Sequence, residues 1–514
     1  MIELTLGRSL RLAAERSPDK IAIRCGDEAL THAEINLRGN RLANGLLKLG
    51  LRKGDRVGVI MPNGIDYLAV VYAAAKAGLI LVFMNYRFTG RDIAYQLSDS
   101  NAKALIYGDE FADAVRDARA EHPGVWMIAS RTGEPHDIGT LRDIAGSASD
   151  SEPDVFVSEH DTIYLGYTSG TTGFPKGAIV THRNRSLAYR YWAIEYGFGS
   201  EDRYLQSGPF HHSVQVGFTL AQLSLGGTAT VLPKFDPRDA VNVMKSQKIT
   251  WSFMVPFMYN AILALPEAER RVHDLSELRT FISAASPLPT GVKDRLLEAF
   301  PHVGLHEFYG ATEAGVVTNL RPSEQRNKIR CVGKPILDME VKILDEAANE
   351  VAPGEVGYLY MKGPTLFDGY YGSPDKTAAA FRDGWCTLGD LARIDDDGYL
   401  YIVDRAKDVI KSGGVNIFPA EIEEVLTLHP KVFEVAVVGI PDDRWGEAVH
   451  AIVVPKGDAD VNAVQLMAYC RDNLASYKVP KSLELRSELP RNPGGKVLKR
   501  LLREEFWKNH EVKV

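Results

Sequence analysis

The chain has 514 residues, of which 45% are hydrophobic and 25% charged, and 60 basic against 67 acidic residues give it a formal net charge of −7. This length exceeds one ordinary hydrophobic core, so we expect at least two domains in a globular protein. The negative charge argues against a nucleic-acid-binding protein, which needs a basic face for backbone phosphates.

The cysteines and the first 20 residues argue against further classes of protein. Cys25, Cys331, Cys386 and Cys470 are scattered without a CxxC pair, which argues against a zinc site or a disulfide framework and favours a reducing cytoplasm. The first 20 residues mix acids and bases without an apolar block, so we expect no signal peptide. No window is apolar enough for a transmembrane segment.

Helix and strand signals alternate along the first third of the chain. Residues 35–50 place Ile35, Leu42, Leu46 and Leu49 on one helical stripe. A buried strand at 56–62, a helix at 66–78 ended by Gly78 and a short strand at 102–108 follow. This rhythm favours α/β layers with a largely parallel sheet.

Later segments change character. Residues 145–154 read as a polar loop, whereas 335–400 is rich in Pro and Gly with period-two strands, which favours a small antiparallel, β-rich part. After residue 404 a helix, two strands and another helix follow, so we expect an N-terminal domain of residues 1–404 and a smaller, mobile C-terminal α/β domain of residues 405–514.

The stretch "YTSGTTGFPKG", residues 167–177, is suited to holding phosphate. Glycines let backbone N–H groups turn toward an anion, hydroxyls add donors, and Lys176 adds a positive charge. It is not a P-loop, because Gly177 stands where that motif needs Ser or Thr and no helix signal begins at the lysine. We expect a phosphate-binding loop between two strands.

This stretch resembles the signature loop of the AMP-forming acyl-CoA synthetases, within the adenylate-forming superfamily. Further matching motifs follow in the family's order over nearly the whole chain. They are "AGLILVFMNYRFT" (77–89), "GPFHHS" (208–213), "ISAASPLP" (282–289), "FYGATEAG" (308–315), "LGDLARID" (388–395), "DRAKDVIKSGGVNIFPAEIE" (404–423) and "PRNPGGKVLKR" (490–500).

The resemblance implies a ligase with ATP, Mg²⁺ and coenzyme A as cosubstrates and cofactor. A carboxylate would attack the α-phosphate of ATP to give acyl-AMP, and the coenzyme A thiol would then displace AMP. Catalysis of this kind depends on positioning and charge neutralisation.

The resemblance also implies an ATP site. Glu313 would bind Mg²⁺ together with Thr168, Thr312 would contact the α-phosphate, and Tyr309 would stack on adenine. The implied ATP-binding residues are Thr168, Ser169, Gly170, Thr171, Thr172, Gly173, Lys176, Ala284, Ala285, Ser286, Tyr309, Gly310, Ala311, Thr312, Asp390 and Arg405.

Asp390 matches the family's ribose-binding aspartate, since a carboxylate can accept from two neighbouring hydroxyls. Arg405 is expected beside it. The chain departs from the family here, because Leu388 stands where a threonine usually precedes Gly389-Asp390, so the threonine contact is absent.

The resemblance implies roles in catalysis and domain movement for Lys496, His212 and Lys407, with His212 at the wall between the acid pocket and the thiol tunnel. Lys496 would bridge the substrate carboxylate and the α-phosphate, and Lys407 would be the hinge of the C-terminal domain. Gly413 and Gly414 would line the pantetheine tunnel. Arg87, Trp445, Tyr477 and Lys481 are weaker candidates for the nucleotide end of coenzyme A.

The acid pocket is expected to be apolar. Its implied residues are His212, Phe253, Met254, Val255, Pro256, Ser283 and Gly310. Without Lys or Arg in this set, the pocket suits a medium-chain aliphatic or an aromatic monocarboxylate better than a dicarboxylate. His211 and His212 are read as strand neighbours pointing in different directions, which argues against a metal role.

Other functions stay open on the sequence alone. A free-standing adenylation enzyme that loads a carrier protein, a non-enzymatic nucleotide-binding relative and, more remotely, a luciferase-like oxidase are the alternatives to an acyl-CoA ligase. The expected partners are the acid, ATP and coenzyme A, with a homodimer as one possible assembly.

Overall fold

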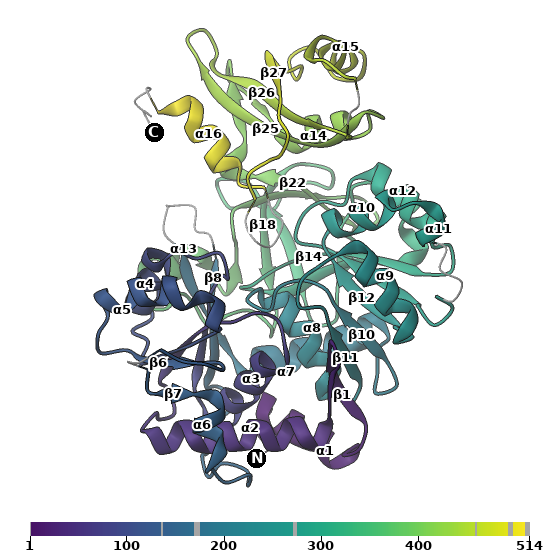
Figure 1. Ribbon diagram of the computed structural model, residues 1–514. Helices are drawn as coiled ribbons and strands as arrows, with labels where there is room; N and C mark the ends of the chain where they lie inside the picture. The colour runs from purple at the N-terminus through teal and green to yellow at the C-terminus, as the bar shows by residue number, and fades with distance from the viewer. Residues whose placement is uncertain are drawn as a thin grey trace.

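The computed structural model describes residues 2–134, 137–168, 175–270, 275–457, 460–491 and 497–508. These residues form two large sheets, A and B, a small antiparallel sheet C and a C-terminal sheet D. Figure 1 shows sheet D with its helices set above the rest of the molecule. The predicted α/β class, with layered sheets, a β-rich part and a smaller C-terminal part, is confirmed.

Sheet A is parallel in its centre and antiparallel at both edges. Because the carboxyl ends of parallel strands share one edge, the segments that follow its central strands open on the same side. In spatial order its strands are β16 (Lys334–Pro335), β15 (Gly315–Leu320), β14 (Gly304–Ala311), β13 (Thr280–Ser283), β12 (Trp251–Met254), β10 (Arg203–Gln206), β11 (Thr228–Val231), β1 (Ile21–Cys25) and β2 (Glu28–Thr31).

Sheet B is parallel except for its last pair, β8 and β9, which is antiparallel. That pair flanks the phosphate-loop sequence, so the prediction of a loop between two strands is confirmed for its flanks. In spatial order the strands are β7 (Gly139–Thr140), β6 (Trp126–Ala129), β5 (Ala104–Tyr107), β3 (Arg56–Ile60), β4 (Ile80–Phe83), β8 (Thr162–Thr168) and β9 (Lys176–Thr181).

Sheets C and D follow in the chain. Sheet C is antiparallel, as the period-two pattern at 357–362 predicts. Its strands are β17 (Glu340–Leu344), β18 (Gly357–Lys362), β19 (Phe381–Arg382), β20 (Trp385–Cys386), β21 (Asp390–Ile394) and β22 (Leu400–Arg405). Those of sheet D are β23 (Ile410–Ser412), β24 (Val415–Ile417), β25 (Val432–Asp442), β26 (Gly446–Pro455) and β27 (Ser482–Leu485).

The helices start and stop where local chemistry predicts. The helix predicted at 35–50 begins at a capping box of Thr31 and Glu34 and ends at Gly50, whose φ of 112° few other residues adopt. The next ends at Gly78, as predicted.

The described helices alternate with the strands along the chain. In the first half they are α1 (Leu6–Arg16), α2 (His32–Leu49), α3 (Ile65–Ala77), α4 (Gly90–Asp99), α5 (Ala112–Glu121), α6 (Leu141–Gly146), α7 (His182–Tyr196) and α8 (Ser213–Ser224). Later come α9 (Pro237–Ser246), α10 (Pro256–Ala264), α11 (Glu267–Arg270), α12 (Thr290–Ala299), α13 (Pro374–Ala380), α14 (Pro419–Thr427), α15 (Ala463–Asn473) and α16 (Lys499–Trp507), with 3₁₀ turns η1 (Asp109–Phe111), η2 (Pro322–Glu324) and η3 (Ala406–Asp408).

One loop prediction needs correction. Helix α6 continues to Gly146, so the loop expected at 145–154 begins two residues late. Within the described part of the chain, every helix is too short or too polar to span a lipid bilayer.

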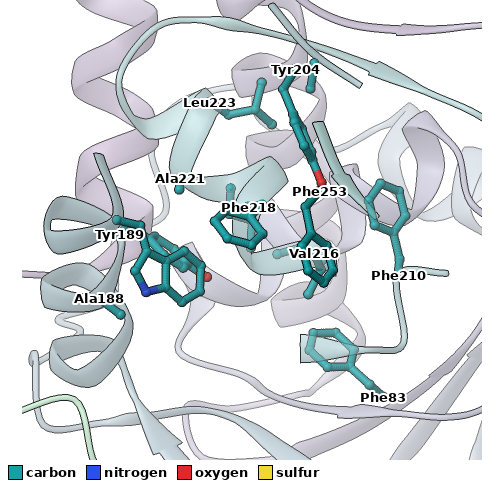
Figure 2. Close-up of a cluster of buried hydrophobic side chains, with 14 of the residues drawn as sticks. Phe83, Ala188, Tyr189, Tyr204, Phe210, Val216, Phe218, Ala221, Leu223 and Phe253 are labelled. Atoms are coloured by element: carbon teal, nitrogen blue, oxygen red, sulfur yellow. The ribbon is translucent and has the colours of Figure 1, made fainter. Parts of the chain in front are cut away.

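An aromatic cluster fills the space between α7, α8 and sheet A (Figure 2). Phe218 lies at its centre, with ring centroids 4.7 Å from Trp192, 5.2 Å from Phe253 and 6.2 Å from Phe308. Such contacts bury large apolar surfaces with favourable ring geometry. The cluster packs helix α8 onto sheet A through Phe253 of β12 and Phe308 of β14.

Replacing Phe218 with alanine should lower the free energy of unfolding by about 3–5 kcal/mol, because a fully buried ring leaves a cavity that the rigid cluster cannot close. Phe156→Ala is the control, since 73% of Phe156 is exposed and its loss should cost at most about 0.5 kcal/mol. Urea unfolding followed by tryptophan fluorescence measures both. Equal midpoints for the two variants would contradict the central place of Phe218.

Candidate active site

The flanks of the phosphate loop face each other across β8 and β9. Thr168 pairs with Lys176 in the strand register, so the hydroxyl and the ammonium lie at the same end of the hairpin. Ser169, Gly170, Thr171, Thr172 and Gly173 lie outside the described residues. Lys176 Nζ is 5.0 Å from the ring centre of Tyr370. Burial and then the charge of Lys376 lower the pKa of Lys176, against the opposing charge of Glu313.

Glu313 is buried at the turn between β14 and β15. Its Oε1 accepts from Thr168 Oγ1 and from Tyr370 Oη, each at 3.1 Å. Its carbonyl accepts from the backbone N–H of Phe367 at 2.7 Å. A buried carboxylate with a hydroxyl beside it is a donor set that Mg²⁺ accepts, since that ion prefers hard oxygens and retains waters.

Tyr370 is a site residue that the sequence reasoning missed. It follows β18 in a loop, it bonds Glu313, and its ring lies beside Lys176. Its sequence, "DGYYG", carries no motif of its own. Backbone pairing with the strand after the phosphate loop, including its bridge to Ala178 and the Tyr371 N–H bond to the Gly177 carbonyl, brings it into the site.

Tyr309, Asp390 and Arg405 form a second group. Asp390 is 3% exposed. It accepts a hydrogen bond from Tyr309 Oη at 2.5 Å and forms an ion pair with Arg405, whose Nε lies 2.7 Å from its Oδ1. Burial raises the pKa of Tyr309 well above its ordinary value, and the charges of Asp390 and then Glu313 raise it further. The Tyr309 hydroxyl therefore stays protonated and donates. A carboxylate has about four acceptor positions, so Asp390 retains capacity for other donors.

The segment after β13 lies at the same edge of sheet A. Ala285 adopts φ 73°, unusual for a residue with a side chain, and it turns the backbone between Ala284 and Ser286. Gly310 needs to be glycine, because a Cβ there would overlap the carbonyl of Gly315 across the β14–β15 hairpin. Ala311 pairs with Gly315 in the same hairpin.

Thr312 is held on two sides. Its Oγ1 lies 3.2 Å from Ser213 Oγ at the start of α8, and its methyl group packs where Gly166 of β8 has no side chain. Thr312 therefore touches both large sheets.

The histidine prediction needs correction. His211 and His212 lie on the turn before α8, not on a strand, and their ring centroids are 4.4 Å apart. Burial lowers the pKa of His212 to about 4, and burial, with the His212 and Arg87 charges, lowers that of His211 well below its ordinary value. Both are neutral near pH 7. Among the described residues, no cluster of three or more His, Cys, Asp or Glu side chains could hold a metal.

The other expected acid-pocket residues lie at the carboxyl ends of β12 and β13. Met254, Val255, Pro256 and Ser283 are buried there, and Ser283 Oγ has no hydrogen-bond partner in the described part of the chain. Phe253, near the end of strand β12, is fully buried. Its ring packs against Phe218 (Figure 2), and its ring centroid lies 5.9 Å from that of Phe308.

The coenzyme A candidates lie in two places. Gly413 and Gly414 form the β23–β24 turn with φ of 58° and 82°, and a Cβ on Gly413 would lie 2.5 Å from the Trp445 ring. Trp445 and Tyr477 are exposed in the C-terminal part, whereas Arg87 follows β4 and stacks near Tyr86. Lys481 bonds Val449 through its backbone.

The C-terminal part touches the rest of the chain beside the site. Thr290 Oγ1 donates to Glu424, and Arg491 lies 5.6 Å from the ring centre of Phe257 on α10. Lys496 lies outside the described residues, but its flanks Arg491 and Val497 form a β-bridge. Lys407 lies in η3, immediately after β22.

Comparison with known proteins finds matches to two family models and to several relatives over most of the chain. The family model described as AMP-binding enzyme matches residues 10–371, and that of the AMP-binding enzyme C-terminal domain matches residues 421–496. The chain is 38% identical over 496 residues to a feruloyl-CoA synthase of Amycolatopsis sp, covering 96% of this chain and 97% of that one. It is 36% identical over 489 residues to the long-chain-fatty-acid–CoA ligase FadD13 of Mycobacterium tuberculosis, covering 93% and 94%.

A solved structure shares the fold. The O-succinylbenzoate coenzyme A synthetase MenE of Bacillus subtilis, in complex with ATP and a magnesium ion, matches with a TM-score of 0.86 and 28% identity over 96% of this chain and 98% of that one.

Asp390 is expected to accept from the ribose hydroxyls of ATP. Replacing it with asparagine should therefore weaken ATP binding by about 1–3 kcal/mol, roughly 5- to 150-fold, because the charged acceptor is lost. Asp397→Asn is the control, since that side chain is 71% exposed and pairs with Lys328. Calorimetric titration with ATP measures both variants. Wild-type affinity in Asp390→Asn would mean that the carboxylate only holds Tyr309 and Arg405 in place.

Proposed function

The chain belongs to the AMP-binding enzyme family as an AMP-forming acid–thiol ligase, and from that premise we propose how its own residues divide the two half-reactions. The observation that carries the proposal is the joining of Thr168, Glu313 and Tyr370 at one end of the phosphate hairpin. Tyr309 of the second group lies on β14, and Glu313 lies at the turn of the same β14–β15 hairpin, so one hairpin carries a residue of each group.

In the first half-reaction the phosphate loop, from Thr168 to Lys176, holds the β- and γ-phosphates of ATP. Lys176 neutralises their charge, and the neighbouring Tyr370 ring limits where its ammonium can lie. Thr312 donates to the α-phosphate. Lys496 bridges that phosphate and the acid's carboxylate as the new bond forms.

Glu313 and Thr168 would hold Mg²⁺, which would draw charge from the phosphate oxygens when bound. Tyr370 keeps the Glu313 carboxylate turned toward the loop. Asp390, with Arg405 beside it, accepts from the ribose hydroxyls, and Tyr309 with the Ala284–Ser286 segment encloses the adenine.

In the second half-reaction the C-terminal part turns about Lys407. This movement withdraws Lys496 and brings Gly413 and Gly414 to the site, where the absence of side chains leaves room for pantetheine. Trp445 and Tyr477, with Lys481 and Arg87, bind the nucleotide end of coenzyme A. His212, neutral because its pKa is lowered to about 4, separates acid from thiol without adding charge.

The acid is a compact monocarboxylate, aromatic or of medium chain length. Met254, Val255 and Pro256 offer no cation for a second carboxylate. Next to Met254 in the chain, the Phe253 ring packs against Phe218 in the aromatic cluster (Figure 2), which favours an acid shorter than a long fatty chain. The relatives are named for an aromatic acid, as feruloyl-CoA synthase, and for aliphatic acids, as long-chain-fatty-acid–CoA ligase, so both acid classes belong in the test. We place the enzyme in the cytoplasm, because its cysteines are free thiols.

A panel of acids assayed for pyrophosphate release tests this proposal. We expect turnover with hydroxycinnamates, benzoates or C6–C10 acids, and none with malonate or palmitate. Adding coenzyme A should yield AMP and thioester, whereas a phosphopantetheinylated carrier protein should not replace it. Preference for malonate or palmitate would overturn the pocket assignment, and thioester formation only on the carrier protein would favour the alternative function.

Replacing Lys496 with alanine should slow acyl-AMP formation by about 10²–10³-fold, because a charge that neutralises the developing bond is removed. Thioester formation from supplied acyl-AMP should stay within a few-fold of wild type. Single-turnover assays separate the two steps, with Lys508→Ala as the exposed control. Equal losses of rate in both steps would contradict the role proposed for Lys496 in the first step.

A further inference from the structure

Arg185 is a buried cation that the roles above do not use. It lies in the first turns of α7, and its side chain is almost entirely shielded from water. Among the described residues, no carboxylate lies within ion-pair distance of its guanidinium. Burial of an unpaired charge costs several kcal/mol in general, so its retention needs an explanation.

The position in the helix makes the cost larger. The N-terminal end of a helix carries partial positive charge, which disfavours a cation. The first turn of α7 contains no acidic residue, and Thr181 with Asn184 caps it through a capping box. Arg185 therefore stabilises neither its own helix nor an ion pair in the described chain.

The guanidinium instead joins the two segments that meet at the phosphates. Its Nε–H donates to Tyr164 Oη on β8, the strand that leads into the phosphate loop. Its Nη2–H donates to the carbonyl of Thr312 at 2.7 Å. A Cβ on Gly315 would lie 3.3 Å from Nη1, so the Thr312–Gly315 turn wraps around the guanidinium.

Three contacts from α7, α8 and β8 hold the turn that contains Thr312 and Glu313. Arg185 holds the Thr312 carbonyl, Ser213 holds its hydroxyl, and Gly166 leaves space for its methyl group. Glu313 follows directly, with its carboxylate on Thr168 and Tyr370. Lysine could not replace this fork, because a single ammonium lacks the planar pair of donors that reaches both Tyr164 and Thr312.

We propose that Arg185 is a positioning residue of the adenylation step: it holds the Thr312–Glu313 turn against β8, and the phosphoryl groups of bound ATP balance its buried charge. This inference rests on the proposed function, since it assigns Thr312 and Glu313 to phosphate and Mg²⁺. Arg185 acts through that turn and does not touch the reacting atoms.

The test compares Arg185→Met, Arg185→Lys and the control Arg190→Met by ATP–pyrophosphate exchange at varied Mg²⁺ and ATP. Arg190 is a good match because it lies on the same helix, and its guanidinium donates to the Ser186 carbonyl one turn away. We expect Arg185→Met to raise the Mg²⁺ concentration for half-maximal rate about 10- to 100-fold, as loss of an outer-sphere partner does at metal sites. We expect Arg185→Lys to fall between it and wild type, and Arg190→Met to match wild type.

A merely structural role would lower the fraction of folded protein without changing the half-saturating Mg²⁺ or ATP, and that result would overturn the proposal. Should Arg185→Met fail to fold, Tyr164→Phe removes one acceptor of the fork and keeps the core volume. A shift of its half-saturating Mg²⁺ in the same direction supports the proposal, and wild-type values contradict it. Wild-type enzyme that exchanges pyrophosphate with no acid would instead refute the proposed function itself.

Discussion

The hydrogen bonds of the buried Glu313 carboxylate are the constraint on which the site depends. Thr168 belongs to sheet B, Glu313 follows a strand of sheet A, and Tyr370 lies in the loop that follows β18 of sheet C. One carboxylate oxygen thus ties together segments from three sheets. A charged group buried in this way is strongly oriented, because any displacement leaves it without donors. Residues almost 150 positions apart in the sequence are thereby held within hydrogen-bond distance.

Chain topology explains why the site forms at this place. The parallel strands of sheet A end at one edge, and the antiparallel hairpins β14–β15 and β8–β9 bring Thr312, Glu313 and Lys176 to that edge. Sheet C adds Asp390 and Arg405, paired in register on β21 and β22. Since Arg405 immediately precedes η3, which contains Lys407, the proposed ribose-binding end of the site and the proposed hinge are adjacent in the chain.

Much of this could be predicted from the sequence, for identifiable reasons. The helix at α2 and the stop at Gly78 follow from capping and periodicity, which are local, and the ordered motifs indicated the family. Tyr370 and Arg185 could not be found in that way, because their meaning comes from partners such as Glu313 and Thr312 that only the fold brings near. The placing of His211 and His212 on a strand was wrong, since "PFHHS" gives no signal for the tight turn before α8.

In the proposed reaction an acid's carboxylate attacks the α-phosphate, after which a thiol displaces AMP. The most direct measurement supplies an acid labelled with ¹⁸O in its carboxylate, with ATP and coenzyme A, and determines by mass spectrometry where the label goes. This order of steps predicts one ¹⁸O in AMP and the other in the thioester carbonyl. Label in orthophosphate, or AMP without label while thioester accumulates, would contradict it.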